Sequence, residues 1–186
     1  MRAALYIHDN YVLFEVVLSR YFLGTKGEVV VVSSDGRPHR SMEGFLTAAD
    51  MRLDELDLAS IDAFILPGGR EEDIADHAGL RAALRELDAR GCIIAAICGG
   101  PLQLARAGLL DGRQFTSSVA EDHPEAFAGA TFVDQNVVVD GHIVTAQAYG
   151  YVDMALVLGR MLDVFEDERD YQETVQAFRE QRRPTV

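Results

Sequence analysis

The chain has 186 residues, a length typical of one globular domain with a buried core. Hydrophobic residues make up 48% and charged residues 25% of the sequence, which excludes a disordered or fibrous protein. The formal net charge of −13 argues against binding to nucleic acids or to anionic membrane surfaces, because both are polyanions.

Targeting and disulfide signals are missing from the sequence. The N-terminus lacks the charged start, apolar run and cleavage site of a signal peptide. The longest apolar run, 93–97, is too short to cross a bilayer. Cys92 and Cys98 are too few for a disulfide-stapled protein, and on one extended strand they lie too far apart to bond. We therefore expect a reduced, cytoplasmic protein that binds no membrane and no nucleic acid.

Short apolar runs alternate with amphipathic segments, the pattern of a parallel sheet covered by helices. In chain order we expect a strand at 3–8, a helix at 11–23, a strand at 28–32, a polar excursion with a short hairpin at 37–60, a strand at 63–66, a helix at 80–90, a strand at 92–97, a helix at 101–110, strands at 130–139 and 143–146, and helices at 151–165 and 171–182. The strand at 92–97 is the most apolar, so it should be central and buried on both faces.

The sequence Ala-Ala-Ile-Cys-Gly-Gly-Pro at 95–101 predicts a sharp turn between this strand and a helix. Cys98 stands on the turn, before two glycines that allow a tight reversal and a proline that suits a helix start. This pattern is typical of a nucleophile elbow. Amide dipoles at the helix start favour a thiolate, so we expect a lowered pKa for Cys98. The alternative is a cysteine that only packs, the role we assign to Cys92.

Glu15 is the second candidate for a chemical role. Its two neighbours on either side are all apolar, so an acid at this position is unfavourable unless it has a partner. The alternative is a solvated acid on the surface of an amphipathic helix.

Taken together, these residues give the chain a resemblance to the ThiJ/PfpI superfamily, which has peptidase-like, glyoxalase or deglycase, isocyanide hydratase and stress-protein branches. Three segments carry it: the turn at 95–101, the strand and diglycine loop at 62–69, and Phe14-Glu15. The segment 136–146 is similar to the family's late strands. The resemblance implies a single domain over residues 1–186 with a flavodoxin-like three-layer sandwich, a mostly parallel sheet with helices on both faces, related to the class-I glutamine amidotransferase fold.

The resemblance also implies roles for individual residues. Glu15 would face Cys98 as proton donor or acceptor, because a protonated carboxyl group can hydrogen-bond to a thiolate. Backbone amides of Gly68, Gly69 and Gly99 would form an oxyanion hole for the substrate.

The sequence departs from the family pattern at two places. The peptidase-like branch commonly has a histidine directly after the cysteine, where this chain has Gly99. The histidine that would act as the base in a peptidase is therefore missing at this position, which argues against peptidase activity. His123, in a loop after a predicted strand, is the candidate catalytic histidine, with His8 at the end of the first strand left open. The family often has an arginine and a proline-glycine pair where this chain has Gln-Ala-Tyr-Gly at 147–150, so Tyr149 is a candidate lining residue.

The remaining histidines, His39, His77 and His142, are expected on the surface. No metal-ligand cluster and no phosphate-binding loop stands out, so we expect no metal and no cofactor.

The residues support three functions to different degrees. The first is a hydrolase- or lyase-type enzyme in which Cys98 attacks a small-molecule electrophile such as an α-oxoaldehyde, an amide or an isocyanide. The second is a redox-sensing or chaperone-like stress protein whose Cys98 is oxidised without turnover. A glutamine amidotransferase subunit is disfavoured, because His142 has no acid two residues later. The family resemblance also implies a homodimer.

Overall fold

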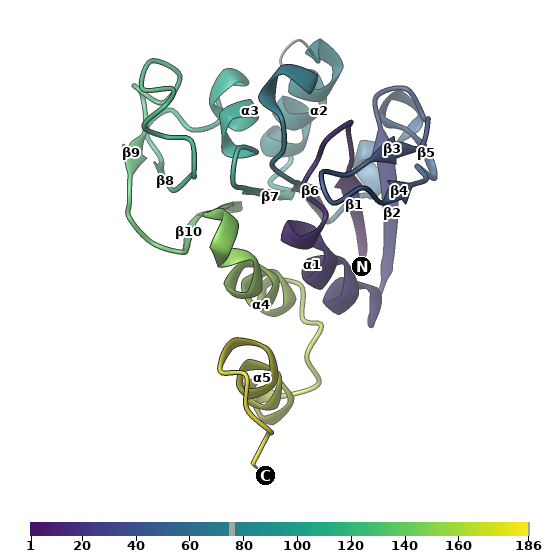
Figure 1. The fold of residues 1–186 in the computed structure, drawn as a ribbon, viewed down its shortest axis with the longest axis vertical. Helices are drawn as coiled ribbons and strands as arrows, with labels where there is room; N and C mark the ends of the chain where they lie inside the picture. Colours follow the sequence, from purple (N-terminus) through teal and green to yellow (C-terminus); the bar gives the residue numbers. More distant parts are fainter. Residues whose placement is uncertain (75–76, 186) are drawn as a thin grey trace.

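The computed structural model describes residues 1–74 and 77–185 (Figure 1). Its main sheet consists of β1 (Arg2–Tyr6), β2 (Glu28–Ser33), β5 (Met51–Arg52), β6 (Ala63–Leu66), β7 (Ile93–Ile97), β10 (Val137–Asp140) and β11 (Ile143–Ala146). The strands lie in the order β10-β11-β7-β6-β1-β2-β5. All neighbouring pairs are parallel except β10 with β11. The predicted mostly parallel sheet is therefore confirmed.

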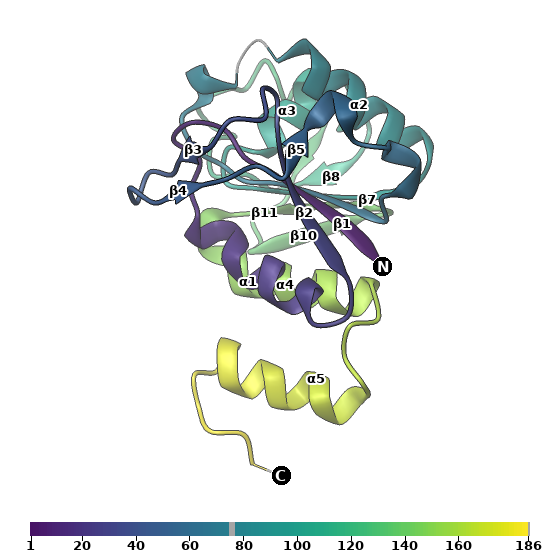
Figure 2. The same cartoon turned by 90° about the vertical axis from the view of Figure 1, so that its right-hand side faces the viewer.

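Helices cover both faces of this sheet. They are α1 (Phe14–Gly24), α2 (Ala78–Ala89), α3 (Pro101–Arg106), α4 (Tyr151–Met161) and α5 (Glu168–Thr174). Figure 2 shows α2 and α3 on one face, α1 and α4 on the other, and α5 outside α4. The arrangement is the three-layer, flavodoxin-like α/β fold expected from the sequence. None of the helices in the described ranges is both long and apolar enough to span a membrane.

The central strands are apolar on both sides because each side faces a helical layer. In β6, Phe64 and Leu66 pack in the core under α2 and α3, whereas Ala63 and Ile65 pack with α1 and α4. β7 alternates in the same way and is hydrogen-bonded between β6 and β11. The prediction of a central strand immediately before Cys98 is therefore confirmed.

Two small pairings complete the structure. The predicted hairpin within 37–60 is formed by β3 (His39–Arg40) and β4 (Leu46–Thr47), which are antiparallel. Strand β8 (Gln114–Phe115), which pairs in parallel with β9 (Thr131–Phe132), was not predicted, nor was the edge strand β5. These strands are two residues long, too short to leave a periodic pattern in the sequence.

Several predicted elements end elsewhere than expected. The helix predicted at 11–23 begins at Phe14, because Tyr11 instead forms an isolated β-bridge with Gly69. The helix predicted at 101–110 ends at Arg106, shortly before Gly108, whose φ of +78° is left-handed. The strand predicted at 130–139 is interrupted and divides into β9 and β10.

The last two helices also differ from the prediction. α4 ends at Met161, four residues early. α5 begins at Glu168 because the Asp167 side chain caps it, accepting from the Asp170 amide at 2.9 Å. It then continues as a π-helical turn over Val175–Arg179.

The parallel strands bring the candidate residues to one edge of the sheet. His8 follows β1, Gly68 and Gly69 follow β6, Cys98 follows β7 and Gln147 follows β11. Because these strands run in the same direction, their carboxyl ends meet at one edge, where open α/β sheets bind ligands.

The start of α3 is packed too closely for a side chain at Gly100. A Cβ there would lie 2.7 Å from the Leu66 carbonyl oxygen and 2.9 Å from that of Ile97. We expect Gly100→Ala to lower the free energy of unfolding by about 1–3 kcal/mol, measured by urea denaturation. Gly99→Ala is the matched control, because its nearest such atom, the Gly69 oxygen, is 3.9 Å away. Equal stability of the two variants would contradict this packing.

Candidate active site

Cys98 occupies a sharp, strained turn. Its φ of +60° lies in the left-handed region, which is unfavourable for a residue other than glycine by about 1–3 kcal/mol. Hydrogen bonds hold this backbone in place: the Cys98 amide donates to the Ala146 oxygen at 2.9 Å, and the Cys98 oxygen accepts from the Ser117 hydroxyl at 2.7 Å and the Ser118 amide at 3.1 Å. The half-buried thiol is therefore presented by a fixed backbone.

Glu15 lies beside Cys98 from the first turn of α1. Its side chain is only 1% exposed, so it is not a solvated acid. Its Oε2 accepts from the Gly68 amide at 2.8 Å, and the carboxyl group hydrogen-bonds to the Cys98 thiol. A Cβ on Gly68 would lie 3.0 Å from both the Cys98 Sγ and the Glu15 Oε2. Gly68 therefore has no room for a side chain between the two acids.

Both acids have raised pKa values, chiefly because they are buried. Burial raises the pKa of Glu15 to about 7. Burial, and then the negative charge of Glu15, raise the pKa of the Cys98 thiol to about 12. Two adjacent negative charges in a buried position are unfavourable, so the pair carries at most one charge at neutral pH.

The expectation of a lowered Cys98 pKa is therefore wrong. The Gly99 amide and the Ser118 hydroxyl both lower it, as the elbow geometry suggests, but burial and Glu15 outweigh them. The helix start and its amide dipoles can be predicted from the sequence. The burial of Cys98 and the charge of the neighbouring carboxylate depend on the fold.

The glycines near Cys98 have different positions. The Gly68 N–H already donates to Glu15, and the predicted oxyanion hole at Gly69 and Gly99 stays a prediction. Gly69 has a φ of +142°, and a Cβ there would lie 2.8 Å from the Cε1 of His8. The Gly99 amide is directed at the Cys98 sulfur.

His8 packs behind the Gly69 loop. It is 1% exposed, its Nδ1 lies 2.8 Å from the Asp9 oxygen, and its Nε2 is buried and has no hydrogen-bond partner among the residues that the structure describes. Burial lowers the pKa of His8 to about 4, so the ring is neutral at neutral pH. His123, in the loop after β8, is not among the groups that most affect the Cys98 pKa, and its catalytic role stays a prediction.

One of the other histidines lies elsewhere than the sequence predicts. His39, expected on the surface, is only 4% exposed, with its ring nitrogens 3.1 Å and 3.0 Å from carboxylate oxygens of Asp9 and Asp35. His77 and His142 are half-buried, and they hydrogen-bond to the Tyr6 hydroxyl at 2.6 Å and to Asp88 at 2.8 Å, respectively.

Ser118 is a site residue that was not predicted from the sequence. Its hydroxyl lowers the pKa of the Cys98 thiol, donates to the Oε1 of Gln147 at 3.0 Å, and accepts from the Ala148 amide at 2.9 Å. The run Thr-Ser-Ser at 116–118, directly after the apolar Phe115, was the available signal. Tyr149 follows Ala148 and is 64% exposed; its contact with a substrate stays a prediction.

Glu43 is the second residue that was not predicted. From the β3–β4 hairpin its carboxylate accepts from the amides of Leu13 and Phe14, each at 3.1 Å, at the start of α1. It thereby holds the turn that carries Glu15, and its charge contributes to the raised pKa of Glu15. A contact across about thirty residues leaves no local sequence signal.

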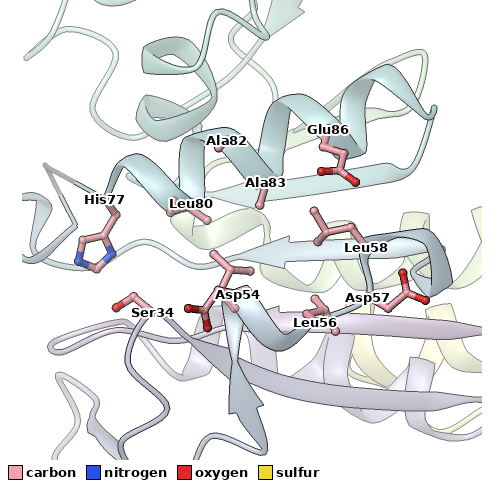
Figure 3. A pocket seen from close by; sticks show the side chains of 12 residues that line it. Ser34, Asp54, Leu56, Asp57, Leu58, His77, Leu80, Ala82, Ala83 and Glu86 are labelled. Atoms are coloured by element: carbon pink, nitrogen blue, oxygen red, sulfur yellow. The ribbon is translucent and has the colours of Figure 1, made fainter.

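The molecule also has a cavity away from this site (Figure 3). It measures about 600 Å³ and lies between α2 and the segment that holds two 3-10 turns, Leu53–Glu55 and Leu58–Ser60. Neither Cys98 nor Glu15 lines it. Within residues 1–74 and 77–185, no group of three or more His, Cys, Asp or Glu side chains could hold a metal ion.

Comparison with known proteins gives one consistent family. The model described as the DJ-1/PfpI family matches residues 1–158. Deglycase TK1284 of Thermococcus kodakarensis is 32% identical over 152 residues, 81% of this chain and 92% of that protein. Uncharacterized protease YoaZ of Bacillus subtilis is 32% identical over 164 residues, 84% of this chain and 77% of that protein.

Solved structures agree with the sequence comparison. The DJ-1 superfamily protein Atu0886 from Agrobacterium tumefaciens superposes with a TM-score of 0.87 and 27% identity, covering 98% of this chain and 100% of that one. A thiJ/pfpI family protein from Bacillus anthracis gives a TM-score of 0.85 and 25% identity, covering 95% and 89%. The family match ends at residue 158, and a single domain over the whole chain stays a prediction.

The buried Glu15 should make the protein less stable as the pH rises. Between the ordinary pKa of 4.5 and the raised value of about 7, the unfolded chain releases this proton while the folded chain keeps it. The free energy of unfolding therefore falls across this window, by about 3 kcal/mol in total. We expect Glu15→Gln to abolish this fall, measured by urea denaturation at pH values on either side of the window.

The matched control is Glu121→Gln, which removes an exposed acid and should keep the parent's pH dependence. If the parent and Glu15→Gln lose stability equally with rising pH, Glu15 does not hold its proton in the folded state.

Proposed function

The chain belongs to the DJ-1/PfpI family, and from this premise we propose that it is a cofactor-free enzyme that uses Cys98 as a nucleophile on small α-oxoaldehydes. The observation that carries the proposal is the Glu15 carboxyl group hydrogen-bonded to the Cys98 thiol under Gly68. A carboxyl group whose pKa is raised to about 7 is suited to both giving and accepting a proton at neutral pH. The relative TK1284 is named as an enzyme, a deglycase, which supports this choice.

The proton shared by the two acids is the basis of the mechanism. Burial raises the pKa of Cys98, and ionising the thiol beside a carboxylate would also place two charges together, which raises it further. Moving the thiol proton onto Glu15 instead produces a thiolate beside a neutral carboxylic acid and leaves the total charge unchanged. The Gly99 amide and the Ser118 hydroxyl then stabilise the thiolate. Glu15 thus acts first as the base.

The attack returns this proton to the substrate. The thiolate electron pair forms a bond from Sγ to the aldehyde carbon, and the carbonyl π pair moves to the oxygen. The amides of Gly69 and Gly99 are the candidate donors to that oxygen. The Glu15 carboxylic acid then protonates it, giving a hemithioacetal on Cys98 and an ionised Glu15.

Turnover requires a second proton movement. Glu15 takes the proton from the former aldehyde carbon and delivers it to the adjacent carbonyl carbon, while the hydroxyl proton passes to the neighbouring oxygen, which gives the thioester of a 2-hydroxy acid. Water hydrolyses this thioester and restores the thiol, so the overall change is oxoaldehyde plus water to 2-hydroxy acid. His123 is the candidate for activating this water, and Tyr149 for contacting the substrate. Because water is the one other reactant, we propose no cofactor.

The test measures 2-hydroxy acid formation from methylglyoxal by NMR. We expect Cys98→Ser to abolish turnover and Glu15→Gln to lower it by about 10²–10⁴-fold, the usual contribution of a general acid–base. Cys92→Ser, which removes the other cysteine, 7% exposed, is the control and should retain the parent's rate.

Two outcomes would contradict the proposal. Turnover that survives in Cys98→Ser would exclude this nucleophile. No turnover by the parent, together with oxidation of Cys98 under mild peroxide detected by intact mass, would favour the stress-sensor function instead. Parallel assays with a simple amide and an isocyanide separate the other two substrate classes.

We also propose that the chain forms a homodimer through an exposed apolar surface. The surface includes Phe14 and Tyr21 of α1, 48% and 59% exposed, and Phe45 and Leu46 of the hairpin, both 63% exposed. The Glu43 carboxylate joins the hairpin to the start of α1, where Phe14 lies. Contiguous exposed apolar side chains are typical of interaction sites. We further propose a cytoplasmic location, because both cysteines are free.

Light scattering after size exclusion tests the dimer. We expect the parent at about twice the chain mass of 20.4 kDa, and Phe45→Glu at the monomer mass. Val139→Glu places the same charge on β10, at a side chain 48% exposed, and should leave the dimer intact. A parent with the monomer mass would exclude this assembly.

A further inference from the structure

We propose that Ser118 is a further catalytic residue, whose hydroxyl group donates a hydrogen bond to the Cys98 sulfur when that sulfur carries a negative charge. The inference rests on the proposed function, because it concerns the same nucleophile. It assigns a role to a residue that lies twenty positions from Cys98 in the sequence and outside the elbow motif.

The backbone fixes Ser118 on the elbow. The Ser118 amide donates to the Cys98 carbonyl oxygen at 3.1 Å, and the neighbouring Ser117 hydroxyl donates to the same oxygen at 2.7 Å. These bonds hold Ser118 beside the elbow, where its hydroxyl group favours the charged form of the Cys98 sulfur. The contact is therefore a consequence of the backbone and not of a mobile side chain.

The buried amide of Gln147 has one consistent orientation. Its Nε2 donates to the Thr116 hydroxyl at 2.8 Å and to the Ser117 carbonyl oxygen at 3.2 Å. A carbonyl oxygen only accepts hydrogen bonds, so the nitrogen of Gln147 must face it. The Oε1 of Gln147 is consequently the atom that faces Ser118, at 3.0 Å.

Ser118 then has one proton and two acceptors for it. One lone pair of its oxygen already accepts from the Ala148 amide at 2.9 Å. The hydroxyl proton can point at the Oε1 of Gln147 or at the Cys98 sulfur. A neutral thiol is a weak acceptor, so in the resting state the proton belongs on Gln147. A thiolate accepts a charge-assisted hydrogen bond, which is roughly twice as strong, so the hydroxyl rotates to the sulfur when the charge forms.

This rotation involves no covalent step. The proton stays on Ser118 throughout, and the proton removed from the thiol still goes to Glu15. The hydroxyl therefore stabilises the thiolate more than the thiol, which is the difference that catalysis requires. Because serine is uncharged, it adds a donor at the sulfur without adding a further charge beside Glu15.

The experiment follows the pH dependence of Cys98 alkylation by iodoacetamide, in a Cys92→Ser background so that one thiol remains. We expect Ser118→Ala to slow alkylation about tenfold at every pH from neutral to mildly alkaline, since a hydrogen bond to a charged group is lost. Ser118→Thr keeps the hydroxyl and should restore the parent's profile. Thermal unfolding monitored by circular dichroism verifies that each variant is folded.

Ser117→Ala is the matched control, because its hydroxyl contacts the Cys98 carbonyl oxygen and not the sulfur. An unchanged profile in Ser118→Ala would overturn the inference, and so would an equal change in Ser117→Ala, which would place the effect in the elbow backbone. The proposed function is tested separately by turnover. If the parent shows no turnover but Ser118→Ala still slows alkylation, this inference stands and the proposed enzyme activity does not. If the parent turns over but Ser118→Ala leaves alkylation unchanged, only the proposed enzyme activity stands.

Discussion

The contact between one carboxyl group and one thiol governs the chemistry of this protein. Glu15 and Cys98 hydrogen-bond at the edge of the sheet, in a position too buried to hold two negative charges. The surrounding groups act on this pair in opposite directions. The Gly68 amide favours a charge on the carboxylate, whereas the Gly99 amide and Ser118 favour a charge on the sulfur. These groups together set which of the two acids holds the proton, and the raised pKa of Cys98 places it on the sulfur until an electrophile arrives.

The fold creates the contact from segments that are far apart in sequence. α1 follows β1 and brings the carboxyl group, while β7 ends at the thiol, and the loop after β6 lies against both groups with no side chain at Gly68. The β3–β4 hairpin holds the start of α1 through Glu43. The segment after β8 holds the elbow through Ser117 and Ser118. Each of these attachments is a hydrogen bond to the backbone, which fixes a position more firmly than a contact between two side chains.

Much of this could be predicted from sequence, where the signal is local. The elbow is encoded by residues adjacent to Cys98, and Glu15 stands out because its neighbours are apolar. Ser118 and Glu43 could not be found in this way, because their partners lie about twenty to thirty residues away and follow no period. His39 was misplaced for the same reason, since its burial depends on Asp9 and Asp35. The predicted direction of the Cys98 pKa shift was wrong, because the shift depends on burial and on a charge contributed by another helix.

The left-handed backbone of Cys98 has an implication for any attempt to engineer this chain. Glycine adopts the same φ of +60° without steric conflict, so the backbone conformation at position 98 is more favourable for glycine than for cysteine. Selection for thermal stability alone would therefore favour replacing Cys98 by glycine. The stabilised variant would lack the reactive thiol. Stability and reactivity compete at a single residue here, and selection for one must be monitored by an assay for the other.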